Sequence, residues 1–126
     1  MKNIIHTASA PHPIGPYSQA VQAGNLLFVS GQIALDPATG ELTGSDLESE
    51  TRQVMENIRA VLTEAGAGMA DVVKTTIFLT DMGHFQRVNE IYGTYFDGNF
   101  PARETVAVAG LPKNVNVEIS VIAVKP

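Results

Sequence analysis

The sequence predicts one α+β domain, in which a β-sheet carries two helices on one of its faces. Three observations lead to this expectation. The chain has 126 residues, the length of a single domain spanning 1–126. Two stretches repeat apolar residues at helical spacing, and six short stretches are rich in β-branched and aromatic residues. Along the chain these elements follow the order β-β-β-α-β-α-β-β.

The N-terminal segment is predicted to be a short edge strand, Ile4 to Thr7, followed by an irregular arm. Pro11, Pro13 and Pro16 fix φ and lack backbone N–H groups, so no regular structure is expected before Tyr17. This stiff arm is a candidate border of a binding site.

A hairpin is predicted after the arm. Its strands are Ser18–Ala23 and Leu26–Ala34, both rich in apolar and β-branched residues. Gly24 and Asn25, which separate them, tolerate the left-handed conformation that a tight hairpin turn requires.

The longest predicted element is a helix that follows a turn at Asp36–Gly40. Ser45, with Glu48 three residues later, forms a capping-box pattern that opens it, and Gly66 ends it. The apolar face of this helix is formed by Leu47, Thr51, Val54, Met55, Ile58, Val61, Leu62 and Ala65.

The second half of the chain adds one helix and three strands. Val72–Thr80 is a strand, and the step into it from the helix predicts a parallel crossover. Asp81 caps a second helix, which closes at Gly98. Its shared face consists of Phe85, Val88, Tyr92, Tyr95 and Phe96, and the last strands are Glu104–Ala109 and Val115–Val124.

Apolar residues occupy both faces of the predicted strands. Leu27 and Val29 alternate with Leu26 and Phe28, whereas a sheet with one solvated face alternates apolar with polar residues. Two helices cover only one face. The other face is therefore expected to pack against another copy of the chain, in a homo-oligomer whose symmetry the pattern does not specify.

Composition excludes several classes of function. The net charge of −5 and the pI near 5.0 disfavour nucleic acid and anionic membranes as partners. The start of the chain lacks the apolar core of a signal peptide, and no apolar run approaches the ~20 residues of a membrane span, so a cytoplasmic location is expected. The absence of cysteine excludes disulfides, thiolate nucleophiles and cysteine-containing zinc sites.

Two charged residues stand out near the end of the chain. Arg103 follows a proline and precedes a strand, and its guanidinium is suited to hold a carboxylate through two parallel hydrogen bonds. Glu118 interrupts a very apolar strand, where a charge is costly unless it is paired or faces a cleft. From the residues alone, a solvated arginine or a plain Arg103–Glu118 ion pair is favoured over a ligand site, and the alternative for Glu118 is a lysine partner on a neighbouring strand.

These residues lie in a series of motifs that extends over nearly the whole chain: GPYSQA at 15–20, FVSGQI at 28–33, VNEIY at 88–92, FPAR at 100–103, LPK at 111–113 and VEI at 117–119. In this order they resemble the Rid/YjgF family of imine and enamine deaminases. The resemblance implies a chorismate-mutase-like subunit, with two helices on one face of a mixed sheet. It also implies a homotrimer with sites between neighbouring subunits.

The resemblance assigns roles to several positions. Arg103 would bind the substrate carboxylate, and Glu118 would position the attacking water. Tyr17 would close the pocket, Ser30 and the Gly31 backbone would approach the ligand, and Asn89 would supply an amide. Without the resemblance, the structural alternatives are favoured for each residue: Tyr17 as a cap on the sheet edge, Ser30 as a small strand residue and Asn89 as an exposed helix residue.

One position departs from the family pattern. Many relatives have cysteine where this chain has Thr105, but the family mechanism uses the main-chain carbonyl there, which threonine retains. The change therefore bears on substrate preference. His6, His12 and His84 lack the spacing of metal ligands, and no phosphate or dinucleotide loop is present, so neither metal nor cofactor is expected.

The activity that the resemblance implies is hydrolysis of short 2-imino acids, such as 2-iminobutanoate and 2-iminopropanoate, to 2-oxo acids and ammonia. Such imines are released by pyridoxal-phosphate dehydratases. An alternative is a non-enzymatic trimer that binds 2-oxo acids or other small carboxylates. A third alternative, a ribonuclease or translation inhibitor, conflicts with the acidic pI and with the lack of a basic, aromatic-lined groove.

Overall fold

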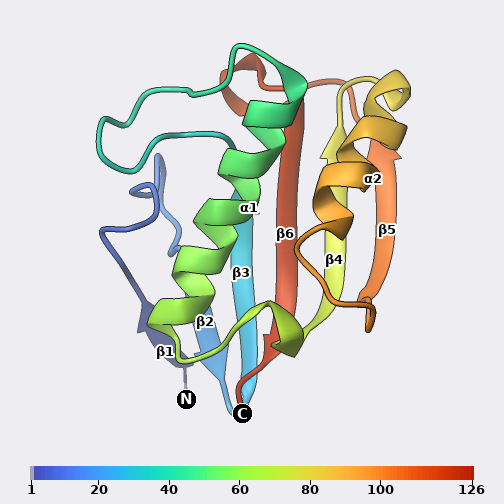
Figure 1. Cartoon of the computed structure of the whole chain (residues 1–126). Coiled ribbons are helices and arrows are strands. Elements are labelled where there is room, and N and C mark those ends of the chain that lie inside the picture. The colour runs from blue at the N-terminus through green and yellow to red at the C-terminus, as the bar shows by residue number, and fades with distance from the viewer. Residues whose placement is uncertain (1) are drawn as a thin grey trace.

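The computed structural model describes residues 2–126. It contains six strands and two α-helices in the predicted order, with both helices on one face of a single sheet (Figure 1). The elements are β1 (Lys2–Ile5), β2 (Ala20–Ala23), β3 (Leu26–Gln32), α1 (Leu47–Glu64), β4 (Val72–Leu79), α2 (Phe85–Gly93), β5 (Ala102–Ala107) and β6 (Val117–Val124).

The sheet is mixed, with the spatial order β1-β2-β3-β6-β4-β5. Only β4 and β5 pair in parallel. Helix α2 connects these two neighbours, whereas α1 connects β3 to β4 with β6 between them, so the predicted crossover is confirmed. The predicted hairpin is also confirmed, because Ala23 pairs with Leu26 and Gly24 has a φ of 62°.

Helix α1 buries the predicted apolar face. Val54, Met55, Ile58, Val61 and Leu62 are all fully buried between the helix and the sheet. The predicted cap was wrong by one residue. The N-cap is Asp46, whose carboxylate accepts a hydrogen bond from the Ser49 backbone N–H at 2.7 Å. A capping side chain bonds to a backbone N–H two or three residues onward, and the helix begins at Leu47, which makes Asp46 rather than Ser45 the cap.

Helix α2 is shorter than predicted. Asp81 caps a 3₁₀ turn at Met82–His84, and the α-helix begins only at Phe85. It ends at Gly93 rather than Gly98, where the Thr94 hydroxyl donates to the Ile91 carbonyl at 2.6 Å. Three of the predicted face residues still pack against the core: Phe85 at the first position of the helix, and Tyr95 and Phe96 beyond its end.

Several strand boundaries also differ from the prediction. The first strand lies two residues earlier, at Lys2–Ile5, because it pairs with Ala20–Ala23. The third ends at Gln32 rather than Ala34, after a register shift that follows Val29. The fifth is Ala102–Ala107 rather than Glu104–Ala109, and the sixth begins at Val117, after a bend in which Lys113 and Asn114 have positive φ.

The two faces of the sheet differ in their cover. On the helix side, Leu27, Ile77 and Ile119 are completely buried. On the other side, Leu26, Phe28, Ile4 and Val106 expose 38%, 43%, 56% and 43% of their surface. A single chain therefore leaves the apolar side chains of this open face exposed, as the strand pattern predicted. None of the helices within residues 2–126 is long and apolar enough to cross a membrane.

Candidate functional site

A first hollow lies between the N-terminal arm and the sheet, with a volume of about 290 Å³. It contains four of the predicted site residues, which come from the arm, β3 and β6: Tyr17, Ser30, Gly31 and Glu118. The arm lines it with Pro11, His12 and Ile14, as expected of a site border. We call this hollow the carboxylate half-site, after Glu118.

Glu118 lies against Gly31 in this hollow. A Cβ atom on Gly31 would be 2.8 Å from Cδ of Glu118 and would overlap its Oε2, so the glycine makes room for the carboxylate. Burial raises the pKa of Glu118 above its usual 4.5. Raising the pKa makes the carboxylate a better proton acceptor once it is ionised.

Ser30 and Tyr17 stand beside the carboxylate, and their polar groups contact the backbone. The Ser30 hydroxyl donates to the Ser18 carbonyl at 2.6 Å, across the start of the hairpin. The Tyr17 hydroxyl accepts from the Ile14 backbone N–H at 3.1 Å, and the residue remains 47% exposed. Both hydroxyls therefore border the hollow in positions set by main-chain contacts.

A second hollow, of about 300 Å³, lies between α2 and the start of β5. It is lined by Asn89, Tyr92, Gly93, Phe100, Pro101 and Arg103, and we call it the guanidinium half-site. The Arg103 guanidinium carbon is 5.2 Å from the centre of the Tyr92 ring and 5.7 Å from that of Phe85. Two aromatic rings therefore lie close to the guanidinium, and within residues 2–126 its N–H groups make no hydrogen bond or ion pair, so they can serve a ligand.

Tyr92 is itself held in place. Its hydroxyl donates to Thr75 Oγ1 at 2.9 Å, inside the protein. Its pKa is raised, chiefly by burial, while the hydrogen bond to Thr75 and the charge of Arg103 act in the opposite direction. The neutral ring thus forms a fixed platform under the guanidinium.

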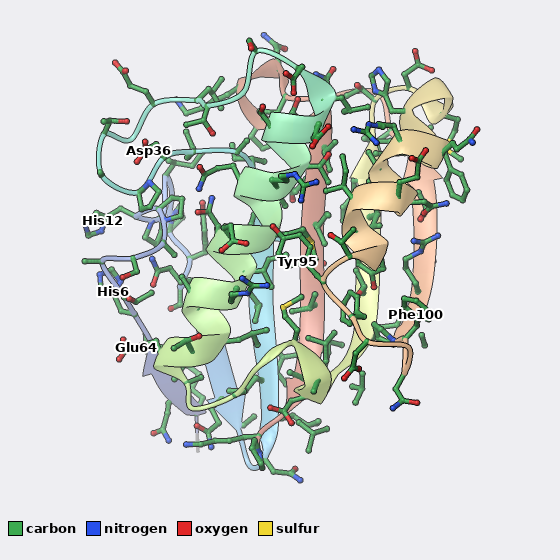
Figure 2. All side chains as sticks on the ribbon, viewed as in Figure 1. His6, His12, Asp36, Glu64, Tyr95 and Phe100 are labelled. Atoms are coloured by element: carbon green, nitrogen blue, oxygen red, sulfur yellow. The ribbon has the colours of Figure 1, made fainter. Side chains whose placement is uncertain are left out.

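Arg103 and Glu118 do not lie together within one chain. Arg103 pairs with Thr75, on the helix side of the sheet, whereas Glu118 pairs with Phe78, on the open face. An ion pair between them within one chain is therefore excluded. The two hollows also lie apart across the width of the sheet, since Figure 2 shows the labelled His12 of the first hollow at the left of the molecule and Phe100 of the second at the right.

Thr105 does not line either hollow. It lies on the same face as Arg103, opposite Ile77, and its buried hydroxyl has no hydrogen-bond partner within residues 2–126. The lysine partner considered for Glu118 is also not found. Lys74 instead pairs with Glu104 at 3.1 Å.

Several residues of the first hollow, among them Gln19 and His12, were not predicted as site residues. Gln19 stood inside the GPYSQA motif but carried no chemical signal of its own, and His12 was considered only as a metal ligand. The His12 ring packs on that of His6, with centroids 5.1 Å apart. Over residues 2–126, no cluster of three or more histidine, aspartate or glutamate side chains is placed to hold a metal ion.

Known proteins are similar to this chain in both sequence and fold. The family described as Endoribonuclease L-PSP matches residues 7–125. The 2-iminobutanoate/2-iminopropanoate deaminase of Mus musculus is 46% identical over 125 residues, 99% of this chain and 93% of the mouse protein.

Solved structures agree with this assignment. One from Thermotoga maritima is 55% identical, with a TM-score of 0.97 over 100% of this chain and 99% of that one. E. coli TdcF, solved with bound serine, is 42% identical, with a TM-score of 0.94 over 98% and 99% of the two chains. The predicted chorismate-mutase-like fold is confirmed. Because the family match spans nearly its entire length, the chain belongs to the Rid/YjgF family, whose model carries the description Endoribonuclease L-PSP.

Proposed function

We propose that the protein hydrolyses short 2-imino acids and their enamine tautomers to 2-oxo acids and ammonia, in sites formed between the subunits of a homotrimer. One observation carries the proposal: the chain presents two incomplete half-sites on opposite faces of its sheet. One supplies a carboxylate and the other a stacked guanidinium. A second copy would supply the missing half of each.

The open face supports this assembly. Glu118 lies on the same face as the exposed Phe28 and Val106, so a neighbour that covers these side chains also approaches the carboxylate half-site. Arg103 lies on β5, the edge strand, where a neighbouring chain has access. The number of copies, three, rests on the family resemblance.

Each half-site has one task in the reaction. Arg103 of one subunit would hold the substrate carboxylate through two parallel hydrogen bonds, with Asn89 beside it. Glu118 of the next subunit would accept a proton from water as the water oxygen bonds to the imine carbon. The electron pair of the C=N double bond moves to the nitrogen of the protonated imine, which gives a carbinolamine.

Collapse of the carbinolamine completes the reaction. Glu118 returns its proton to the nitrogen, the C–N bond breaks with its electron pair on nitrogen, and the hydroxyl proton is lost to solvent. One water is consumed, and one ammonia and one 2-oxo acid are released. Because such imines also hydrolyse in water, correct placement of water and substrate is the main requirement.

The alternative is a trimer that binds 2-oxo acids or related carboxylates without turnover, and the guanidinium of Arg103, which lies over the Tyr92 and Phe85 rings, favours carboxylate binding in either case. Glu118→Gln separates the two functions. Under the proposal, this variant still binds 2-oxobutanoate but loses turnover. The ribonuclease named in the family description is disfavoured by the net charge of −5.

Subunit complementation tests the proposal most directly. Release of 2-oxobutanoate from 2-iminobutanoate generated in situ is measured for Arg103→Ala, for Glu118→Gln, and for trimers that contain both variants. Each variant alone should be inactive, whereas each mixed trimer has one site with both native residues and regains activity. Arg52→Ala, on the exposed surface of α1, is the matched control.

Three results would contradict the proposal. A wild-type protein that leaves the decay of 2-iminobutanoate unchanged would refute the enzymatic activity and favour the binding function. Mixed trimers as inactive as their parents would refute the sharing of a site between subunits. Loss of activity in Arg52→Ala equal to that in Arg103→Ala would remove the special role of Arg103.

A further inference from the structure

Gln19 makes an unusual set of contacts at the foot of the N-terminal arm. Its side chain is 1% exposed. The amide oxygen accepts from the Thr7 backbone N–H at 2.7 Å. The amide nitrogen lies 3.0, 3.2 and 2.8 Å from the carbonyl oxygens of Thr7, Ala10 and Pro11. One side chain thus contacts three residues of the arm.

The orientation of this amide is unambiguous. A backbone N–H can only donate, so the amide oxygen must face Thr7, and three carbonyls can only accept, so the amide nitrogen must face them. Two N–H groups serve three acceptors, so all donors of the amide are used. Gln19 therefore has no hydrogen-bond donor left for a ligand, although it lines the hollow.

The backbone of the arm depends on a side chain such as Gln19 for its hydrogen bonds. Three of its residues are prolines, which cannot donate to a sheet, and the arm belongs to no strand between β1 and β2. Buried backbone groups without a strand partner need another one. Gln19 supplies it for Thr7, which is 9% exposed, and for Ala10, which is 1% exposed.

The backbone of Gln19 is connected to the strand that borders the carboxylate half-site. Its backbone carbonyl accepts from the Ser30 N–H at 2.9 Å, and Ser30 precedes Gly31, which lies against Glu118. Gln19 thus links β3, which borders Glu118, to the arm, whose His12, Ile14 and Tyr17 line the same hollow. No other side chain in the described part of the chain makes more than one hydrogen bond to the arm.

We propose that Gln19 is a positioning residue, which fixes the arm as one wall of the carboxylate half-site and thereby sets the affinity for the substrate. The role in affinity rests on the proposed function. Gln19 acts on substrate through the arm, whereas Glu118 is held by β6 and Arg103 by α2 and β5. Loss of the amide should therefore weaken binding more than it slows the chemical step.

Gln19→Glu is the sharpest test, because it keeps the shape and the acceptor for Thr7 but removes the donors to three carbonyls. The matched control is Gln22→Glu, on the strand that directly follows Gln19, where the amide reaches only the nearby Gly24 carbonyl. In trimers of Gln19→Glu, we expect KM for 2-iminobutanoate and Kd for 2-oxobutanoate to rise about tenfold, with a smaller change in kcat. Gln22→Glu should match the wild type.

A measurement on the unaltered protein keeps the test decisive if Gln19→Glu does not fold. The Thr7 amide should exchange its hydrogen with solvent as slowly as the amides of β2, because its partner is buried. Exchange at the rate of an unstructured peptide would overturn the proposal. So would a lowered melting temperature in Gln19→Glu with KM and Kd unchanged, since Gln19 would then be structural only.

The two proposals can fail separately. If the wild type neither hydrolyses 2-iminobutanoate nor binds 2-oxobutanoate, the proposed function fails. Thr7 exchange then still decides whether Gln19 holds the arm. If the wild type is active and Gln19→Glu keeps native KM and Kd, the function stands and the positioning role is refuted.

Discussion

Replacing Gly31 with alanine should displace the Glu118 carboxylate while the fold remains intact. The added methyl group would lie 2.8 Å from Cδ and 3.1 Å from Cγ of Glu118, inside the 3.4 Å at which ordinary contact begins. Glu118 is a flexible side chain, so it can move, and the φ of Gly31 lies outside the left-handed range, so alanine fits the backbone. The substitution therefore acts on the carboxylate rather than on the sheet.

The size of the effect follows from the displacement. Cδ must retreat from 2.8 to 3.4 Å and Oε2 must move farther, on the order of 1 Å, and a misplacement of that size can lower a rate by about 100-fold. The free energy of unfolding should change by less than about 1 kcal/mol, because alanine also restricts the unfolded chain. We expect a lower kcat with a nearly unchanged melting temperature.

The assay compares initial rates of 2-oxobutanoate release from 2-iminobutanoate for the wild type, Gly31→Ala and Gly68→Ala. Gly68 is a matched control, because a methyl group there meets no atom within 4 Å and its φ is outside the left-handed range. Wild-type kcat in Gly31→Ala would refute the reasoning, since Glu118 would then act equally well from a displaced position. A large loss of stability would show that the sheet, rather than the side chain, absorbs the clash.

Two further predictions concern stability. Burial raises the pKa of Glu118, so its charge should destabilise the fold above that pKa, and the penalty should disappear below the usual 4.5. In an Arg103→Ala background, Glu118→Gln should therefore raise the free energy of unfolding at pH 7 but not at pH 4. When Arg103 is present on a neighbouring subunit, the gain in unfolding free energy from Glu118→Gln should be smaller. Equal gains with and without Arg103 would contradict a site shared between subunits. Tyr92→Phe should cost about 1–3 kcal/mol in urea unfolding, because it leaves the fully buried Thr75 hydroxyl unpaired, and an unchanged midpoint would contradict this.

Much of the fold could be predicted from local patterns. The apolar spacing of α1 located its buried face, because a long amphipathic helix repeats its signal over several turns. Its cap was placed one residue early, since Ser45 and Asp46 are both good capping residues and only the first helical turn distinguishes them. The end of α2 was missed for a similar reason, because Thr94 interrupts the helix through its own hydroxyl.

The arrangement of the candidate site could be predicted only in part. The motifs identified residues that line the two hollows, including Ser30, Gly31, Asn89 and Arg103. They did not show that Arg103 and Glu118 lie on opposite faces. A shift of one residue in strand register reverses the face of a side chain, and the register depends on long-range pairing of β4 with both β5 and β6.

The anchoring of the arm by Gln19 has a consequence for evolution. The amide contacts only main-chain atoms of Thr7, Ala10 and Pro11. Side chains farther along the arm, such as His12 and Ile14, face the hollow without holding the arm in place by any contact to this amide. Mutation can therefore exchange them while the path of the backbone is kept. Under the proposed function, substitutions along the arm change the substrate preference, while Arg103 and Glu118 keep their places on other elements of the fold.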